Sequence, residues 1–274
     1  MARDLRMKLV AIVRASRQPE EAAQALADAS GLTLAEARMR LAPEPPALLA
    51  RLEPDKAATL VVSLRKGGLA ALAVDVPCPT GKDRTVAHSF SFSDAGITFM
   101  PRFGDSMQVL WADVLAILRG LRASRSDVER TEKSRSFSVA TAVATGGLKM
   151  TRTSTKTVHS RDESTEQVIL VYARDGRVAM AAEHQLDFSC LGPGMHPSST
   201  GNMVELAHRL REKAKAAFYD ERLLRLGRRP LPFLAGSESR SRAGTIVGTR
   251  TETSGSLDVL AEVMRQALAE GLLP

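Results

Sequence analysis

The chain has 274 residues, enough for one large or two smaller domains, and its 44% hydrophobic and 25% charged residues are typical of a globular protein. The net charge of +7 is a small excess over this length, so charge alone does not indicate a nucleic-acid or other anionic partner. Aromatic residues make up only 4%, so Leu, Val and Ala must fill most of the core.

The cysteines and the apolar runs indicate the cellular compartment. Cys78 and Cys190 are too few for a disulfide framework in a chain of this length, and we expect both to be free thiols in a reducing compartment. The apolar run Leu9–Val13 is shorter than the roughly 7–15 residues of a secretory signal, and no run reaches the roughly 20 residues of a membrane span. We therefore expect a cytoplasmic protein with no membrane partner.

Residues 7–76 carry the signals of a small module with the order β-α-α-β-α-β. The run at 7–15 predicts a buried strand, 48–52 a short extended segment and 69–76 a final strand. The residues that begin and end the three helices are, in chain order, Pro19, Gly31, the capping box of Thr33 and Glu36, Pro43, Pro54 and the pair Gly67-Gly68.

Four features of this module carry a family resemblance. They are GLTLAEAR at 31–38, a proline after the second helix, Asp55 and Lys56 at the start of the third helix, and GGLAALAV at 67–74. Together they resemble the C-terminal domain of the bacterial large-subunit ribosomal stalk protein, over residues 7–76 only. The resemblance implies the fold of that domain.

The residues that form the binding surface of the stalk family differ in this chain. In that family, a basic and aliphatic surface on the first two helices binds translational GTPases. The first helix here reads QPEEAAQALADAS at 18–30, and the family's Lys-Glu-Ala-Lys becomes Ala-Glu-Ala-Arg at 35–38, which keeps one cation. The resemblance therefore implies a docking module for another partner, not a ribosomal protein. Arg38 and Arg40 are candidate partner contacts, and a solvated helix face is the alternative.

A linker and a β-rich domain are expected next. Residues 77–85, PCPTGKDRT, show no periodicity and predict the linker. Residues 86–235 predict a mostly antiparallel β barrel or sheet domain, with a hairpin at 88–102 and a second hairpin turning at Asp175-Gly176. The stretch 107–111 reads as a strand, and the residues after it as a short helix or a further strand.

A long helix is expected to close this domain. The sequence at 202–226 has helical spacing, with Ser199 or Thr200 as its N-cap. Strands closed by one long helix resemble a pleckstrin-homology-like domain in architecture, which implies binding of phosphoinositides, peptides or other proteins. The arginines at the end of the helix suit an acidic partner or a solubilising face: Arg222, Arg225, Arg228 and Arg229.

A second basic stretch lies within the β-rich domain, at 149–161. It is rich in Ser, Thr, Lys and Arg, and it is interpreted as an exposed edge hairpin or a mobile loop. Lys149, Arg152 and Lys156 are candidate contacts to an anionic partner, and a solvated strand is the alternative.

The C-terminal part is expected to be a tethered helix. Residues 236–255 are polar and rich in Gly, Ser and Thr, so they predict a flexible linker. Residues 256–273 form an amphipathic helix whose mixed charges argue against a membrane surface. We expect it to dock on the first module of this chain or of another copy, so self-association through this helix stays open.

No catalytic, cofactor or metal motif is present, and we predict no catalytic residues, no cofactor and no metal. The overall prediction is an α+β protein: a β-α-α-β-α-β module, a β-rich domain and a C-terminal helix. The leading hypothesis is a non-enzymatic cytoplasmic adaptor with an unidentified protein partner. The alternative is a nucleic-acid-binding protein that uses residues 149–161 and 222–229, and an enzyme of unfamiliar type is a third hypothesis.

Overall fold

The computed structural model describes residues 7–75, 84–137, 151–227, 231, 237–240, 246–252 and 254–274. The fold is α+β, as the sequence predicts, and most strand pairs are antiparallel. The predicted features that lie outside the described residues are most of the linker 77–85, Cys78, Lys149, Arg228 and Arg229.

The first module has the predicted order of elements. They are β1 (Lys8–Ile12), α1 (Pro19–Ser30), α2 (Leu34–Leu41), β2 (Ala47–Leu52), α3 (Pro54–Lys66) and β3 (Ala71–Asp75). The strands form an antiparallel sheet in the order β2-β1-β3. The capping box of Thr33 and Glu36 is present, and Gly31 ends α1 in the left-handed conformation, with φ 69°.

Successive residues of β1 belong to two different cores. Val10 and Ile12 are buried with the apolar residues of α1, α2 and α3. Leu9, Ala11 and Val13 are buried on the other face of the sheet, together with the C-terminal helix α7 (Ser254–Ala269). This alternation is the ordinary two-residue period of a strand, and it makes β1 buried on both faces.

The second module contains two sheets and one long helix, α5. Its elements are β4 (Thr85–Ala87), β5 (Ser89–Phe92), β6 (Gly96–Met100), β7 (Met107–Leu110), β8 (Val114–Phe137), β9 (Thr151–Ala173), β10 (Val178–Ala182), α5 (Ser199–Lys213), β11 (Phe218–Asp220), α6 (Leu223–Leu226), β12 (Ser237–Arg240) and β13 (Ile246–Glu252). One sheet has the order β5-β6-β7. The other has the order β12-β13-β8-β9-β10-β4, with β11 also paired to β8.

One alternative for this module is decided and one expectation is corrected. Of the barrel and the sheet, the sheet is correct, because the described strands form open sheets and the longer one ends at β12 and at β4. The predicted helix at 202–226 ends at Lys213, because Phe218–Asp220 adopt an extended conformation and pair with Ala116–Leu118 of β8. Of the two alternatives for the residues after 111, the further strand is correct, since Val114 begins β8.

The segment 236–255, expected to be a flexible linker, contains two strands. β13 pairs with β8 from Ile246↔Arg130 to Glu252↔Ser124, and β12 pairs with β13. The β-branched residues of TIVGTRTET favour a strand once a neighbouring edge is available. That edge belongs to a strand more than a hundred residues earlier in the chain, and a local pattern does not reveal it.

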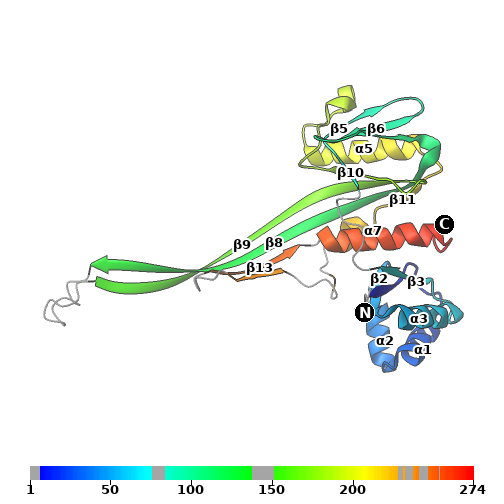
Figure 1. Ribbon diagram of the computed structural model, residues 1–274, viewed down its shortest axis with the longest axis horizontal. Helices are drawn as coiled ribbons and strands as arrows, with labels where there is room; N and C mark the ends of the chain where they lie inside the picture. Colours follow the sequence, from blue (N-terminus) through cyan, green and yellow to red (C-terminus); the bar gives the residue numbers. More distant parts are fainter. Residues whose placement is uncertain are drawn as a thin grey trace, which may run out of the picture.

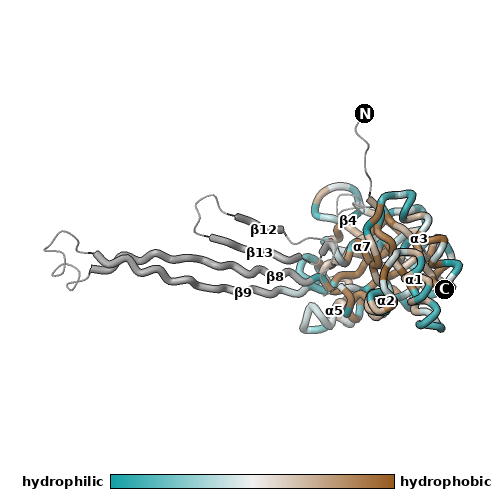
Figure 2. The backbone as a smooth tube through the Cα atoms, turned by 90° about the horizontal axis from the view of Figure 1, so that it is seen from below, coloured by the Kyte–Doolittle hydropathy of each residue, from teal (hydrophilic) through white to brown (hydrophobic). Residues whose placement is uncertain are grey.

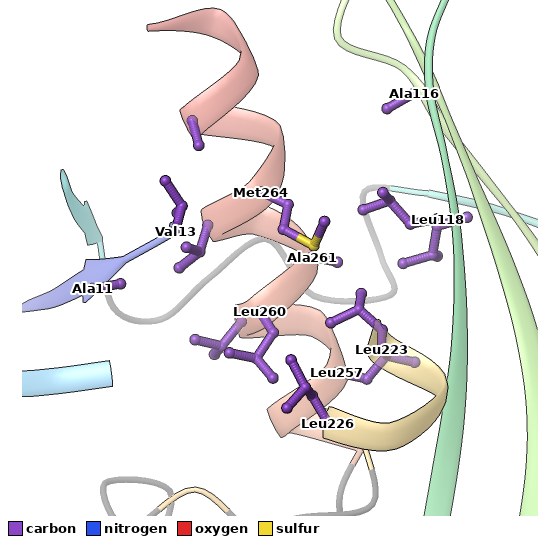
Figure 3. Close-up of a cluster of buried hydrophobic side chains, with 14 of the residues drawn as sticks. Ala11, Val13, Ala116, Leu118, Leu223, Leu226, Leu257, Leu260, Ala261 and Met264 are labelled. Carbon is purple, nitrogen blue, oxygen red and sulfur yellow. The ribbon is translucent and has the colours of Figure 1, made fainter. Parts of the chain in front are cut away.

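Helix α7 is a shared core element of both modules. It lies between the first module and β8, as Figures 1 and 3 show. Its residues Leu257, Leu260 and Met264 are at most 2% exposed. They share one cluster with Leu9 of β1 and Val13 just after it, with Leu118 of β8 and with Leu223 of α6. In Figure 2 the helix and the chain around it are mostly hydrophobic. The helix therefore docks within its own chain, and its apolar residues are not left for self-association.

Gly96 is the position where a side chain is least tolerated in the β5-β6-β7 sheet. A Cβ atom at this residue would lie 2.2 Å from the carbonyl oxygen of Val109 and 2.9 Å from the Cα atom of Leu110. Because both obstacles are backbone atoms, the strands must separate to admit it. We expect Gly96→Ala to lower the free energy of unfolding by about 1–3 kcal/mol, measured by urea denaturation. Ser91→Ala, on an exposed residue of β5, is the control and should leave it unchanged.

Candidate interaction surfaces

The longest feature of the molecule is the arm, which consists of residues 122–137 of β8 and 151–166 of β9. Its strands pair without a shift in register from Arg122↔Glu166 to Phe137↔Thr151. At about 3.3 Å per residue the arm is roughly 50 Å long. Figure 1 shows it projecting away from both modules. For residues 151–161, the hairpin alternative is therefore correct and the loop alternative is wrong.

Polar contacts fix the base of the arm to the second module. Arg119, which is 8% exposed, donates to Glu221 Oε1 at 2.6 Å and to Gln167 Oε1 at 3.2 Å. Nearby on the same two strands, the guanidinium of Arg122 lies 3.7 Å from the carboxylate of Glu166. Arg119 is mostly buried and Glu221 is half-exposed, and their charge-assisted hydrogen bond ties β8 to the residue that follows β11 at the base of the arm.

Glu183 joins the same region to the start of α5. Its carboxylate accepts hydrogen bonds from Ser199 Oγ at 2.8 Å, from Thr200 Oγ1 at 2.6 Å and from the backbone N–H of Gln167 at 3.0 Å. Burial alone would raise the pKa of Glu183, but these hydrogen bonds outweigh it and hold the pKa below its ordinary value. The carboxylate is thus ionised at neutral pH and connects β9 to α5.

The two edges of the arm are covered unequally. On the β8 side, β13 pairs with residues 124–130. On the β9 side, pairing with β10 begins only at Val168. Of the strands that the structure describes, none pairs with this side of β9 at 151–166. We call these residues the β9 edge. A strand edge of this length is a template for another strand, so the β9 edge is a candidate protein interface.

The charges of the arm are distributed unevenly along its length. The outer half, 131–137 with 151–157, contains four cations and one acid: Lys133, Arg135, Arg152, Lys156 and Glu132. The inner half, 123–130 with 158–165, contains three cations and four acids: Arg125, Arg130, Arg161, Asp127, Glu129, Asp162 and Glu163. The predicted candidates Arg152 and Lys156 thus lie on the positive outer half.

The other basic stretch lies at the junction of the two modules. Arg222 donates to the carbonyl oxygen of Pro45 at 3.0 Å and to Asp220 Oδ2 at 2.8 Å. Arg225 pairs with Glu44 at 2.6 Å, and this hydrogen bond raises the pKa of Arg225. Both arginines therefore contact their own chain, and β11, just before them, pairs with β8 at Ala116–Leu118, at the opposite end of β8 from the outer arm. Among the described residues, the two basic stretches thus lie at opposite ends of β8 and do not form one surface.

Arg38 and Arg40 lie on α2, where the sequence places them. Arg38 pairs with Glu20 of α1 on the surface. Arg40 donates to the carbonyl oxygen of Leu49 and lines a groove of about 520 Å³. The groove runs between α1, β2 and α3, and its lining also includes Leu32, Leu52, Asp55, Lys56 and Leu60. Apolar walls with charged groups at the side suit a short peptide segment.

A second groove, of about 400 Å³, lies where β4 meets the loop between β6 and β7. Its lining includes His88, Arg102, Phe103 and Gln185. The side chain of Phe103 is 90% exposed, and His88 Nδ1 lies 3.0 Å from the carbonyl oxygen of Gln185. The sequence does not predict this groove, because three separate segments form it and none has a recognisable motif.

Among the described residues, no three His, Cys, Asp or Glu side chains lie close enough together to hold a metal ion. Cys190 is exposed and unpaired. No helix in the described part of the chain combines the length and the apolar character that crossing a membrane requires.

Comparisons with known proteins give no relative on which a function could be based. No family model matches the chain, no curated protein matches it, and no solved structure matches it.

Proposed function

We propose that this chain is a non-enzymatic cytoplasmic adaptor that binds another protein chain through its arm. The observation that supports this most directly is the β9 edge, beside which no described strand lies. Such an edge presents a row of backbone N–H and C=O groups. An extended segment of a partner can add to it as a further strand and form main-chain hydrogen bonds.

The composition of the arm supports the same proposal. A two-stranded ribbon is at best marginally stable in water unless a third strand or an apolar face supports it. Residues 123–137 and 151–165 consist mainly of Ser, Thr and charged residues. On the β8 side, β13 provides a third strand for the inner half. On the β9 side, a partner strand would provide the corresponding support.

The first module offers a second surface, as an adaptor requires. Its groove beside Arg40 and Lys56 has the size and mixed lining of a peptide-binding site. Because α7 shares one core with both modules and Arg222 contacts Pro45 of the first module, partners bound at the groove and at the arm would be held on one body. The resemblance of the module to a docking domain remains a prediction that agrees with this role.

The proposal is tested with a chain whose outer arm is removed. Arg130 and Val158 are register partners whose backbone groups face each other, so residues 131–157 can be replaced by an Asn-Gly turn that leaves the pairing with β13 intact. We expect the full chain to retain a protein partner from the source cells through a wash at about 1 M salt, which screens surface charges. The shortened chain should lose that partner. Equal capture by both chains would contradict the proposal.

Nucleic-acid binding is the second candidate, and the charge of the outer arm favours it. A two-stranded β-ribbon fits the major groove of DNA, and four cations lie on the outer half. Binding of this kind weakens steeply with salt through counterion release. The double variant Lys133→Gln/Arg135→Gln separates the candidates, because it removes two cations from β8 and leaves the sequence of β9 unchanged. Loss of captured nucleic acid in this variant, without a salt-resistant protein, would favour the second candidate.

A further inference from the structure

We propose that the partner of the β9 edge is the β9 edge of a second copy of this chain. This inference rests on the proposed function and names the partner for the arm. The two edges would pair antiparallel around a two-fold axis at His159, and the four strands would form one continuous ribbon in the order β8-β9-β9-β8. Backbone geometry restricts the possible registers, and the charge sequence of β9 selects this one among them.

The backbone geometry fixes which residues face the partner. At the base of the arm, the N–H of Gln167 donates to Glu183 Oε2 at 3.0 Å, and its C=O accepts from the backbone N–H of Glu183 at 3.0 Å. Both backbone groups of Gln167 therefore point away from β8. Since the β8–β9 register has no shift along the arm, the same direction recurs at every second residue down to Thr151, including His159.

Only some registers are compatible with this alternation. In an antiparallel pair, residues whose backbone groups point at the partner must lie opposite each other. A two-fold axis at His159 satisfies this requirement, because it places Thr157 opposite Arg161 and Thr155 opposite Glu163. A register displaced by one residue would set an inward-facing residue opposite an outward-facing one and lose the hydrogen bonds.

The charges of β9 select one register among those that remain. The outer half of the β9 edge contains Arg152 and Lys156, and the inner half contains Asp162, Glu163 and Glu166 with one cation, Arg161. Pairing about His159 sets Lys156 opposite Asp162, twice by symmetry. A shift of two residues in either direction puts Lys156 opposite Ser160 or Ser164 and removes this pair.

The arrangement is also isologous, as a two-fold dimer requires. The same residues contribute from both copies, so the interface closes and does not propagate into a fibre. The paired length, 152–166, matches the part of β9 that lies between the outer end of the strand and the start of β10. In this dimer nearly the whole β9 edge is paired with the second copy, up to the point where pairing with β10 begins.

The test uses charge reversal in the full-length chain and measures mass by sedimentation equilibrium. The wild-type chain should form a dimer of twice the 29.5 kDa of one chain. Lys156→Glu and Asp162→Lys should each weaken dimerisation at least roughly tenfold, since like charges then face each other at two symmetry-related places. An equimolar mixture of the two single variants should recover the dimer, because the carboxylate introduced at position 156 of one chain then meets the ammonium introduced at position 162 of the other.

This recovery by mixing excludes a folding defect as the cause of the loss. The double variant Lys156→Glu/Asp162→Lys should also recover the dimer, and Lys133→Glu, with the same charge change on β8, should not disturb it. A monomeric wild-type chain at about 100 μM, or single variants that dimerise like wild type, would overturn the inference. If the chain is monomeric but the shortened arm still loses a captured protein, the proposed function stands and only the self-pairing fails.

Discussion

Replacing Met264 by alanine should destabilise both modules together, by about 2–5 kcal/mol. Met264 is completely buried in α7 and belongs to the cluster that contains Leu9 and Val13 of the first module and Leu118 of the second. The change removes the Cγ methylene, the sulfur and the terminal methyl group, and it leaves a cavity that packed neighbours fill only in part. Because both modules share this core, the free energy of unfolding should fall for the elements on both sides of α7.

Hydrogen exchange followed by mass spectrometry checks this result peptide by peptide. In Met264→Ala, protection should fall in residues 8–12 of β1 and in residues 168–173 of β9, along with a lower urea midpoint. Val204→Ala is the control, since Val204 is 49% exposed on α5 and its truncation should change stability little. Unchanged protection of β1 alongside reduced protection of β9 would show that the modules unfold independently and that α7 is not their common core.

Removing the carboxylate of Asp258 should cost about 3 kcal/mol of the free energy of unfolding. The guanidinium of Arg84 contacts Asp258 at 2.6 Å and 3.1 Å through two nitrogens, and both side chains are largely buried. Within the described part of the chain, the Nε atom of Arg84 has no hydrogen-bond partner. In Asp258→Ala the cation would remain buried without its counter-charge.

The companion variant makes this prediction specific. Arg84→Met/Asp258→Leu replaces the pair by apolar side chains of similar volume, and it should recover most of the stability that Asp258→Ala loses. Urea denaturation of the three chains measures both effects. Arg225→Ala breaks the exposed pair with Glu44 and should leave the urea midpoint nearly unchanged. If the double variant is as unstable as Asp258→Ala, Asp258 acts through the packing of α7 and not through its charge.

The first module shows how far local signals reach. Pro19, Gly31, the capping box of Thr33 and Glu36, and Pro54 mark helix ends by interactions within a few residues, and each lies at the predicted place. The sequence at 168–181, with its Asp-Gly turn, likewise predicts its hairpin. In these segments the residues that determine the structure are neighbours in the chain.

The predictions that were wrong concern segments whose structure depends on residues far apart in the chain. The helix predicted over 202–226 ends early because Phe218–Asp220 pair with β8, and the predicted linker 236–255 contains β13 because β8 offers it an edge. Among the candidate residues, Arg222 and Arg225 contact the first module, which no local pattern indicates. The sequence identifies Arg152 and Lys156 as residues of a basic stretch, but it leaves open whether that stretch is a hairpin or a loop, and it does not give the length of the arm.

The sequence by itself determines the α+β class, the order of elements in the first module, and the amphipathic character of the C-terminal helix. Helix caps, tight turns and apolar periodicity depend on residues only a few positions apart, so a short stretch of sequence is enough to predict them. Only the tertiary structure decides that α7 becomes the common core of both modules and that β8 and β9 continue beyond the body as an arm. These features depend on contacts between residues far apart in the chain, and many polar sequences of similar composition remain loops without such contacts.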